Sequence, residues 1–192
     1  MTDRIRHLME QIDTLEAELN KALQEKQIHL NFTIQGKRIK FEKSITEAHK
    51  NLKIGLIKWL GNRPRNLITA PIIYGMIIPM LVLDICITFY QMTCFPIYGI
   101  KKVKRSDYMV FDRRHLSFLN FVEKSHCIYC TYGNGLLAYA TEVLARTEQY
   151  FCPIKHARKM LGVHTRYKQF IEYGDATDYH KRLEDFRKSL GN

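Results

Sequence analysis

Residues 67–100 have the sequence LITAPIIYGMIIPMLVLDICITFYQMTCFPIYGI, in which Asp84 is the only charged residue among 34. About 20 apolar residues are enough for a helix to cross the roughly 30 Å hydrocarbon core of a bilayer. A straight helix of 34 residues would be about 50 Å long. The stretch is therefore predicted to be a helical membrane segment that bends.

Three prolines, Pro71, Pro79 and Pro96, offer places for this bend. Basic residues flank the segment on both sides: Arg63, Arg65, Lys101, Lys102, Lys104 and Arg105. Because positive charge is retained on the cytoplasmic side, both ends are expected there, together with both termini. This favours a re-entrant hairpin or two short helices, with Asp84 at the turn or as a cap. Two alternatives stay open: a single span from about Ile72 to Tyr90, and a buried helical pair in a soluble protein.

The distribution of charge favours a lipid partner. The net charge is +11, with 13 Lys and Arg against 8 Asp and Glu before Leu67, and 17 against 10 after Ile100. A basic excess on both sides of an apolar segment is typical of proteins at anionic lipid surfaces. The basic residues form no stripe interleaved with aromatic side chains, so no nucleic-acid partner is expected.

The region 1–28 is predicted to be an amphipathic, coiled-coil-like helix. Apolar residues recur there at intervals of three and four positions: Ile5, Leu8, Ile12, Leu15, Leu19 and Leu23. Such a seam is typical of a helix that pairs with another helix. Residues 5–28 are therefore a candidate surface for self-association or for a protein partner, and packing on the chain's own body is the alternative.

The region 29–66 is predicted to contain a small β-hairpin followed by an amphipathic helix. Apolar and polar residues alternate over 29–41 with a turn at 35–37, which indicates two short strands. Ser44 and Glu47 form a capping-box pattern at the start of a helix that runs to about Leu60. Its basic side and Trp59 suit a membrane surface, and an ordinary core-facing helix is equally compatible with the pattern.

The region 101–192 is predicted to be a helical domain with a Cys/His site. One helix is expected to begin near Asp107 and to loosen or end at Gly133-Asn134-Gly135, and the next to cover about 136–150. On the first helix, Glu123, Cys127 and Cys130 share one face, and Glu148, Cys152 and His156 share a face of the second. Pro153 alternatively starts a separate helix capped by Cys152.

These residues predict a metal centre. Cys127-Ile128-Tyr129-Cys130 and Cys152-Pro153-Ile154-Lys155-His156 supply three thiolates and an imidazole, the ligands of a Cys3His zinc site. In an iron centre, Glu123 or Glu148 would replace one of them. Two alternatives stay open: dithiol redox chemistry with Cys152 as the resolving thiol, and reduced cysteines that only pack. Five cysteines, an odd number, do not suggest a secreted disulfide framework.

Several motifs together resemble a family of small uncharacterised bacterial membrane-associated proteins with a CxxC…CPIKHA pattern. They are Asp-Arg-Arg-His-Leu at 112–116, Cys-Ile-Tyr-Cys at 127–130, Tyr-Gly-Asn-Gly at 132–135, Ala-Arg-Thr-Glu-Gln-Tyr at 145–150 and Cys-Pro-Ile-Lys-His-Ala at 152–157. The Asp84–Ile100 stretch fits the same pattern. The resemblance implies membrane association and adds weight to the Cys/His set, but it implies no activity.

The sequence thus predicts a mainly α protein with a bent or re-entrant membrane segment and a small Cys/His-bearing helical domain. The leading function is a membrane-associated protein with a structural or sensing zinc or iron centre. The first alternative is a membrane-bound metal- or thiol-dependent enzyme that acts on a lipid-soluble substrate. The second is a membrane scaffold that recruits a partner through its N-terminal helix.

Overall fold

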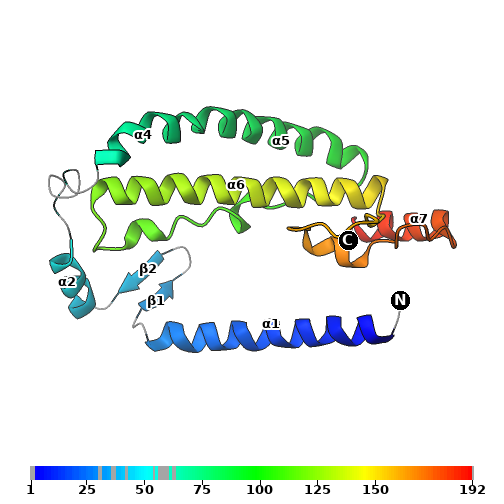
Figure 1. Cartoon of the computed structure of the whole chain (residues 1–192), viewed down its shortest axis with the longest axis horizontal. Coiled ribbons are helices and arrows are strands. Elements are labelled where there is room, and N and C mark those ends of the chain that lie inside the picture. Colours follow the sequence, from blue (N-terminus) through cyan, green and yellow to red (C-terminus); the bar gives the residue numbers. More distant parts are fainter. Residues whose placement is uncertain are drawn as a thin grey trace.

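The computed structural model describes residues 3–29, 32–35, 38–41, 43–53, 55, 61 and 64–191. The protein is mainly helical, which confirms the predicted class. Figure 1 shows α5 alongside α6, with α5 at the upper edge of the molecule and α1 set apart at the lower edge. The α-helices are α1 (Asp3–His29), α2 (Lys43–Asn51), α4 (Pro64–Gly75), α5 (Ile77–Ile97), α6 (Phe121–Phe151) and α7 (Tyr179–Ser189).

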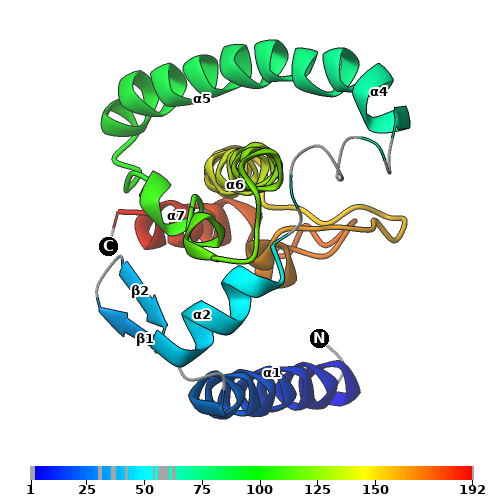
Figure 2. The same cartoon turned by 90° about the vertical axis from the view of Figure 1, so that its left-hand side faces the viewer.

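The apolar segment forms one curved path, α4 followed by α5, interrupted at Met76 (Figures 1 and 2). There the Met76 amide donates to the Ile73 carbonyl three residues back, at 3.3 Å. Gly75 and Pro79 account for the bend, because proline has no N–H to donate to the preceding turn. The helix bends without doubling back. The expectation of a re-entrant turn or cap at Asp84 is wrong, since Asp84 lies within α5.

α6 runs parallel to α5, and side-chain pairs follow one another in the same order along both helices. Asp84 meets Tyr132, Gln91 meets Tyr139, and Tyr98 packs on Tyr150. The chain must therefore return between the two helices, and it does so as irregular backbone with two short 3-10 turns, η1 (Arg105–Asp107) and η2 (Arg113–His115). A continuous helix from about Asp107 is thus not formed. α6 begins at Phe121, where Asn120 and Glu123 make a reciprocal capping box.

α6 continues without a break through Gly133 and Gly135, where the sequence predicts a helix end. Both glycines are buried at close contacts with other segments. A Cβ atom at Gly133 would lie 3.2 Å from the Met80 side chain, and one at Gly135 would lie 2.7 Å from the Tyr108 carbonyl oxygen. The small residues permit packing here rather than ending the helix.

The core lies between α5, α6 and the returning segment. Its fully buried side chains include Phe95, Leu136, Tyr139 and Val143. α7 closes one end: the Gln149 amide donates to Ser189 Oγ at 2.9 Å, and the Lys101 amide donates to the Leu190 carbonyl at 2.9 Å. These contacts hold α7 against the C-terminal ends of α5 and α6.

After α6 the chain is extended and does not start a new helix at Pro153. The Ile171 amide donates to the Pro153 carbonyl at 2.8 Å, and the Lys155 amide donates to the Ile171 carbonyl at 2.7 Å, which makes a parallel bridge between Ile154 and Ile171. A third 3-10 turn, η3 (Thr165–Gln169), precedes this bridge in the returning chain. Cys152 is therefore the C-cap of α6 and caps no following helix.

At the N-terminal side, β1 (Phe32–Gln35) and β2 (Arg38–Phe41) pair antiparallel, with Phe32 opposite Phe41. α2 ends at Asn51, and its His49 ring packs edge-on against Phe118 at 5.2 Å between centroids. The second helix therefore does not run to about Leu60 as predicted, since Leu52, Lys53 and Gly55 are not helical. Residues 36–37 of the predicted turn at 35–37, and Trp59, lie outside the described residues.

Candidate functional site

The predicted metal ligands lie at opposite ends of α6. Cys127 and Cys130 are in its first half, and Cys152 follows its last residue. Cys130 and Cys152 are 22 positions apart in the sequence, which corresponds to about 33 Å along a continuous helix. The structure therefore does not bring Cys152 and His156 to the CxxC pair, and a metal bound at Cys127 and Cys130 would need other ligands.

The remaining predicted ligands have partners in the structure. Glu123 accepts a hydrogen bond from the Asn120 amide at 2.9 Å, as part of the cap of α6. Glu148 Oε2 lies 2.9 Å from His164 Nε2. His156 stacks on Tyr167, with 6.2 Å between ring centroids. Within the described part of the chain, no three His, Cys, Asp or Glu side chains are grouped so that they could hold a metal ion.

The most prominent surface feature is a stripe of exposed apolar side chains along α4 and α5. Figure 2 shows these two helices as one arc at the edge of the molecule, with α6 on its inner side. Within the described residues, Ile68–Ile97 is the one helical stretch long and apolar enough to cross a membrane. We call the stripe the outer face. It consists of eight side chains that are more than half exposed: Ile68, Ile72, Ile78, Val82, Ile85, Phe89, Met92 and Ile97.

The opposite side of α5 is buried against α6 and carries two polar residues. Asp84 is 6% exposed and Gln91 is 5% exposed. Asp84 accepts hydrogen bonds from Arg105 Nη2 at 2.5 Å and from the Tyr132 hydroxyl at 2.8 Å. The buried Asp84 carboxylate is thus paired and hydrogen-bonded, as buried charges require.

Gln91 ties the same returning segment to α5. Its Oε1 accepts a hydrogen bond from the Val103 amide at 2.7 Å, and its Nε2 donates to the Tyr139 hydroxyl at 3.0 Å. The sequence did not predict that Arg105 and Tyr132 pair with Asp84, or that Gln91 is a buried anchor. The available signal was the spacing of Asp84 and Gln91, which are seven positions apart and therefore share one face of a helix.

The returning segment is antiparallel to α5 and lies alongside it. Val103 is bonded to Gln91, Arg105 to Asp84, and Phe111 lines a pocket with Ile77. Lys101, Lys102, Lys104 and Asp107 in this segment are exposed. Charged, irregular backbone therefore accompanies the apolar helix along much of its length.

An apolar pocket of about 480 Å³ lies where α4 and α5 meet the first half of α6. The Tyr129 hydroxyl donates to the Ile73 carbonyl at 2.6 Å and the Tyr132 hydroxyl to Asp84, so both hydroxyls are engaged elsewhere. The lining residues are Tyr74, Ile77, Leu81, Phe111, Ser125, Ile128, Tyr129 and Tyr132. The lining of this pocket suits an apolar group. It contains no pair of side chains arranged for acid–base or nucleophilic chemistry.

A second polar cluster joins α6 to η3. Glu142 accepts hydrogen bonds from Arg146 Nε at 2.9 Å and from Arg166 Nε at 3.0 Å. Burial opposes the charged form of Glu142, but hydrogen bonds from Arg166 and Arg146 outweigh it and lower the pKa of this carboxyl. Arg166 also donates to Gln149 Oε1 at 2.9 Å. The cluster connects α6 to η3 and is a structural ion-pair network.

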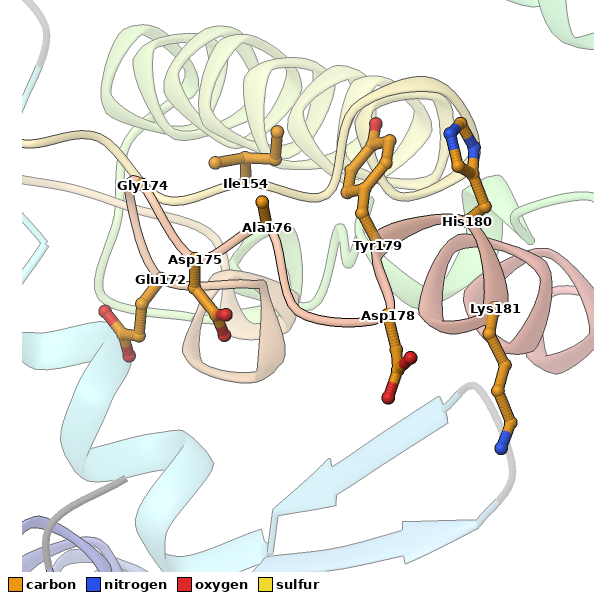
Figure 3. Close-up of a pocket in the computed structure, with 9 residues that line it drawn as sticks. All are labelled: Ile154, Glu172, Gly174, Asp175, Ala176, Asp178, Tyr179, His180 and Lys181. Atoms are coloured by element: carbon orange, nitrogen blue, oxygen red, sulfur yellow. The ribbon is translucent and has the colours of Figure 1, made fainter.

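A pocket of about 730 Å³ lies beside the start of α7 (Figure 3). Figure 3 shows Tyr179 and His180 pointing away from Asp178 and Lys181, so its polar groups do not converge. Asp175 is paired with Arg182 at 2.6 Å. The hydrogen bond from Arg182 lowers the Asp175 pKa to about 2. The pocket is open to solvent, and two of its carboxylates, Glu172 and Asp175, already form ion pairs with Lys155 and Arg182.

Comparisons with family models, with curated proteins and with solved structures gave no match. The resemblance carried by the CxxC…CPIKHA pattern therefore stays a prediction. Of the features described above, the outer face is the one that most directly indicates a partner, because contiguous exposed apolar surface of this extent marks interaction with a membrane or another protein.

Proposed function

We propose that this protein is a membrane-surface scaffold: the outer face of α4 and α5 lies in one leaflet of an anionic bilayer, and the basic body is held against that leaflet. The helix is embedded parallel to the membrane plane and does not cross it. Both ends of the apolar segment are then on the same side, as the basic flanks suggest.

The observation that supports this orientation most directly is the returning segment beside α5. If α5 crossed the bilayer, the exposed residues Lys102, Lys104 and Asp107 would lie at the same depth as its middle. Irregular backbone exposed to hydrocarbon is not found in membrane proteins, because its unpaired N–H and C=O groups would cost several kcal/mol each. A helix in the membrane plane keeps this segment on the aqueous side.

The free energy of membrane binding favours this in-plane position of α4 and α5. Burying one large aliphatic or aromatic side chain contributes about 1.5–3 kcal/mol, and the outer face offers eight side chains that are more than half exposed. Each Lys or Arg near an anionic surface adds about 1 kcal/mol. Lys101, Lys102 and Lys104 follow directly after the apolar segment and are exposed. Apolar insertion and charge attraction therefore act at the same place.

Flotation of the full chain with lipid vesicles tests the proposal. We expect binding to vesicles containing phosphatidylserine, weaker binding to purely zwitterionic vesicles, and a loss of binding of at least about tenfold for Phe89→Glu. Leu161→Glu is the matched control, because Leu161 is 87% exposed but lies outside the outer face. If Phe89→Glu floats like the wild type and Leu161→Glu, the outer face is not the membrane contact.

A further inference from the structure

We propose that α1 pairs with α1 of a second copy of this chain in a parallel, two-stranded coiled coil. This inference goes beyond membrane attachment and does not depend on it. Its starting point is an apolar seam on α1: Leu8, Ile12, Leu15 and Leu19 are between 45% and 63% exposed. They are spaced by four, three and four positions, so they lie along one side of the helix.

The rest of the chain leaves this seam uncovered. Figures 1 and 2 show α1 separated from α5 and α6. Within the described residues, Asp13 of α1 forms an ion pair with Lys168 at 4.0 Å, and Asp13 is not on the seam. In water most helical stability comes from packing an apolar face, so a helix of this length with an exposed seam indicates a helical partner.

The residue types on the seam indicate the form of the pairing. With Ile5 at heptad position a, Leu8 and Leu15 fall at d, and Ile12 falls at a. β-branched residues at a combined with Leu at d favour parallel dimers, because their side chains fit the packing geometry of two strands. Leu19 at the third a position continues the seam. A second copy of α1 supplies the same surface and completes it.

The flanking charges are compatible with a parallel homodimer. In this arrangement a g residue of one helix faces the e residue five positions later in its partner. The pairs are Arg4 with Met9, Gln11 with Glu16, and Glu18 with Leu23. None of them joins like charges, so no repulsion opposes association of identical helices. The seam covers only about three heptads, and we expect a reversible dimer.

Site-directed disulfide crosslinking of the full chain tests this pairing. In a parallel dimer the two residues at position 8 face one another, so Leu8→Cys is expected to give an oxidised dimer well above the background of the five native cysteines. Glu10→Cys is the control, because position 10 is on the outer side of the heptad and Glu10 is exposed. An antiparallel pair would place position 8 near position 19 of its partner and would give no excess dimer.

A second variant pair tests the apolar seam itself. Leu15→Lys in the Leu8→Cys background is expected to lower the crosslinked fraction by at least about tenfold. Thr14→Lys adds the same charge one position away, off the seam, and is expected to leave crosslinking unchanged. Crosslinking that survives Leu15→Lys, or that is equal for Leu8→Cys and Glu10→Cys, would overturn the proposal. Both measurements can be made without lipid, so failure of membrane binding would not affect them.

Discussion

Asp84, in the middle of an apolar helix, is held by Arg105 from the segment that returns beside it, with 2.5 Å between Oδ2 and Nη2. The carboxylate is almost fully buried, whereas the Arg105 side chain is 46% exposed. The buried Asp84 therefore anchors the returning segment to α5 through Arg105. The guanidinium of Arg105 remains in contact with water. This contact places charged, irregular backbone next to α5, and so bears on how the helix can sit at a membrane.

The Asp84–Arg105 pair is expected to contribute measurably to stability. Asp84→Asn should lower the free energy of unfolding by about 1.5–3 kcal/mol, since hydrogen bonds to charged groups are lost. Arg105→Gln should cost at least as much, because it leaves the buried Asp84 carboxylate without its charge partner. Urea unfolding of both single variants and the double variant would measure the coupling. Asp107→Asn, at an exposed neighbour, is the control, and strictly additive effects would show that the pair is not coupled.

The two glycines of α6 are expected to differ in their tolerance of alanine. Gly135→Ala should destabilise the protein by about 1–3 kcal/mol, because the added Cβ meets the Tyr108 backbone oxygen at 2.7 Å. Gly133→Ala should be nearly neutral, since it meets only the flexible end of Met80 at 3.2 Å and gains helix propensity. Thermal unfolding of the two variants checks this order. The reverse order would mean that the returning segment does not pack on α6 as described.

The depth of the outer face in a bilayer distinguishes a helix in the membrane plane from a crossing helix. Ile72, Ile85 and Ile97 are 76%, 69% and 78% exposed and sample the length of the face. With each replaced by tryptophan in a Trp59→Phe background, quenching by brominated lipids should place all three at about 5–10 Å depth. A crossing helix would instead place Ile85→Trp near the bilayer centre and the other two near opposite surfaces.

Glu142 is expected to make the protein acid-sensitive. The pKa of Glu142 is lower in the folded state than in the unfolded state. Its contribution to the free energy of unfolding is therefore fully present at pH values above the unfolded-state pKa of about 4.3. This contribution is lost as the pH falls through the folded-state pKa. Glu142→Gln should therefore reduce the difference in stability between pH 7 and pH 3. Unfolding free energies measured over this range check the slope. Glu184→Gln serves as the control, because Glu184 pairs with Arg187 at the exposed surface. An unchanged slope in Glu142→Gln would contradict the assignment.

The separation of the cysteines can be tested by chemical crosslinking. Cys127 and Cys130 are three positions apart on one helix, so the shortest bismaleimide should link them within one chain. The same reagent should not link Cys130 to Cys152 within one chain, because α6 holds them about 33 Å apart. Peptide mass mapping after digestion would identify the products. A Cys130–Cys152 link within a monomer would show that α6 is not continuous. The predicted Cys3His metal site would then again be possible.

The sequence by itself determined the local features of this protein. The apolar run predicts the helical segment that contains Asp84, and the spacing of Leu8, Ile12 and Leu15 predicts the seam of α1. The alternation over 29–41 predicts the region in which β1 and β2 pair. Each of these follows from residue spacing, because periods of 3.6 and 2 place side chains on one face of a helix or strand. Such patterns need no knowledge of what packs against them.

Only the tertiary structure decided the arrangement around α6. Glycine costs about 1 kcal/mol in a helix, so Gly133 and Gly135 favour a helix end until their contacts with Met80 and the Tyr108 backbone are known. The continuous helix then separates Cys130 from Cys152, although both lie in a pattern typical of a metal site. Asp84 likewise acquires its role from Arg105, 21 positions away. Residue spacing in the sequence predicts which side chains share one face of a helix or strand. Contacts between segments distant in the sequence determine what packs against that face.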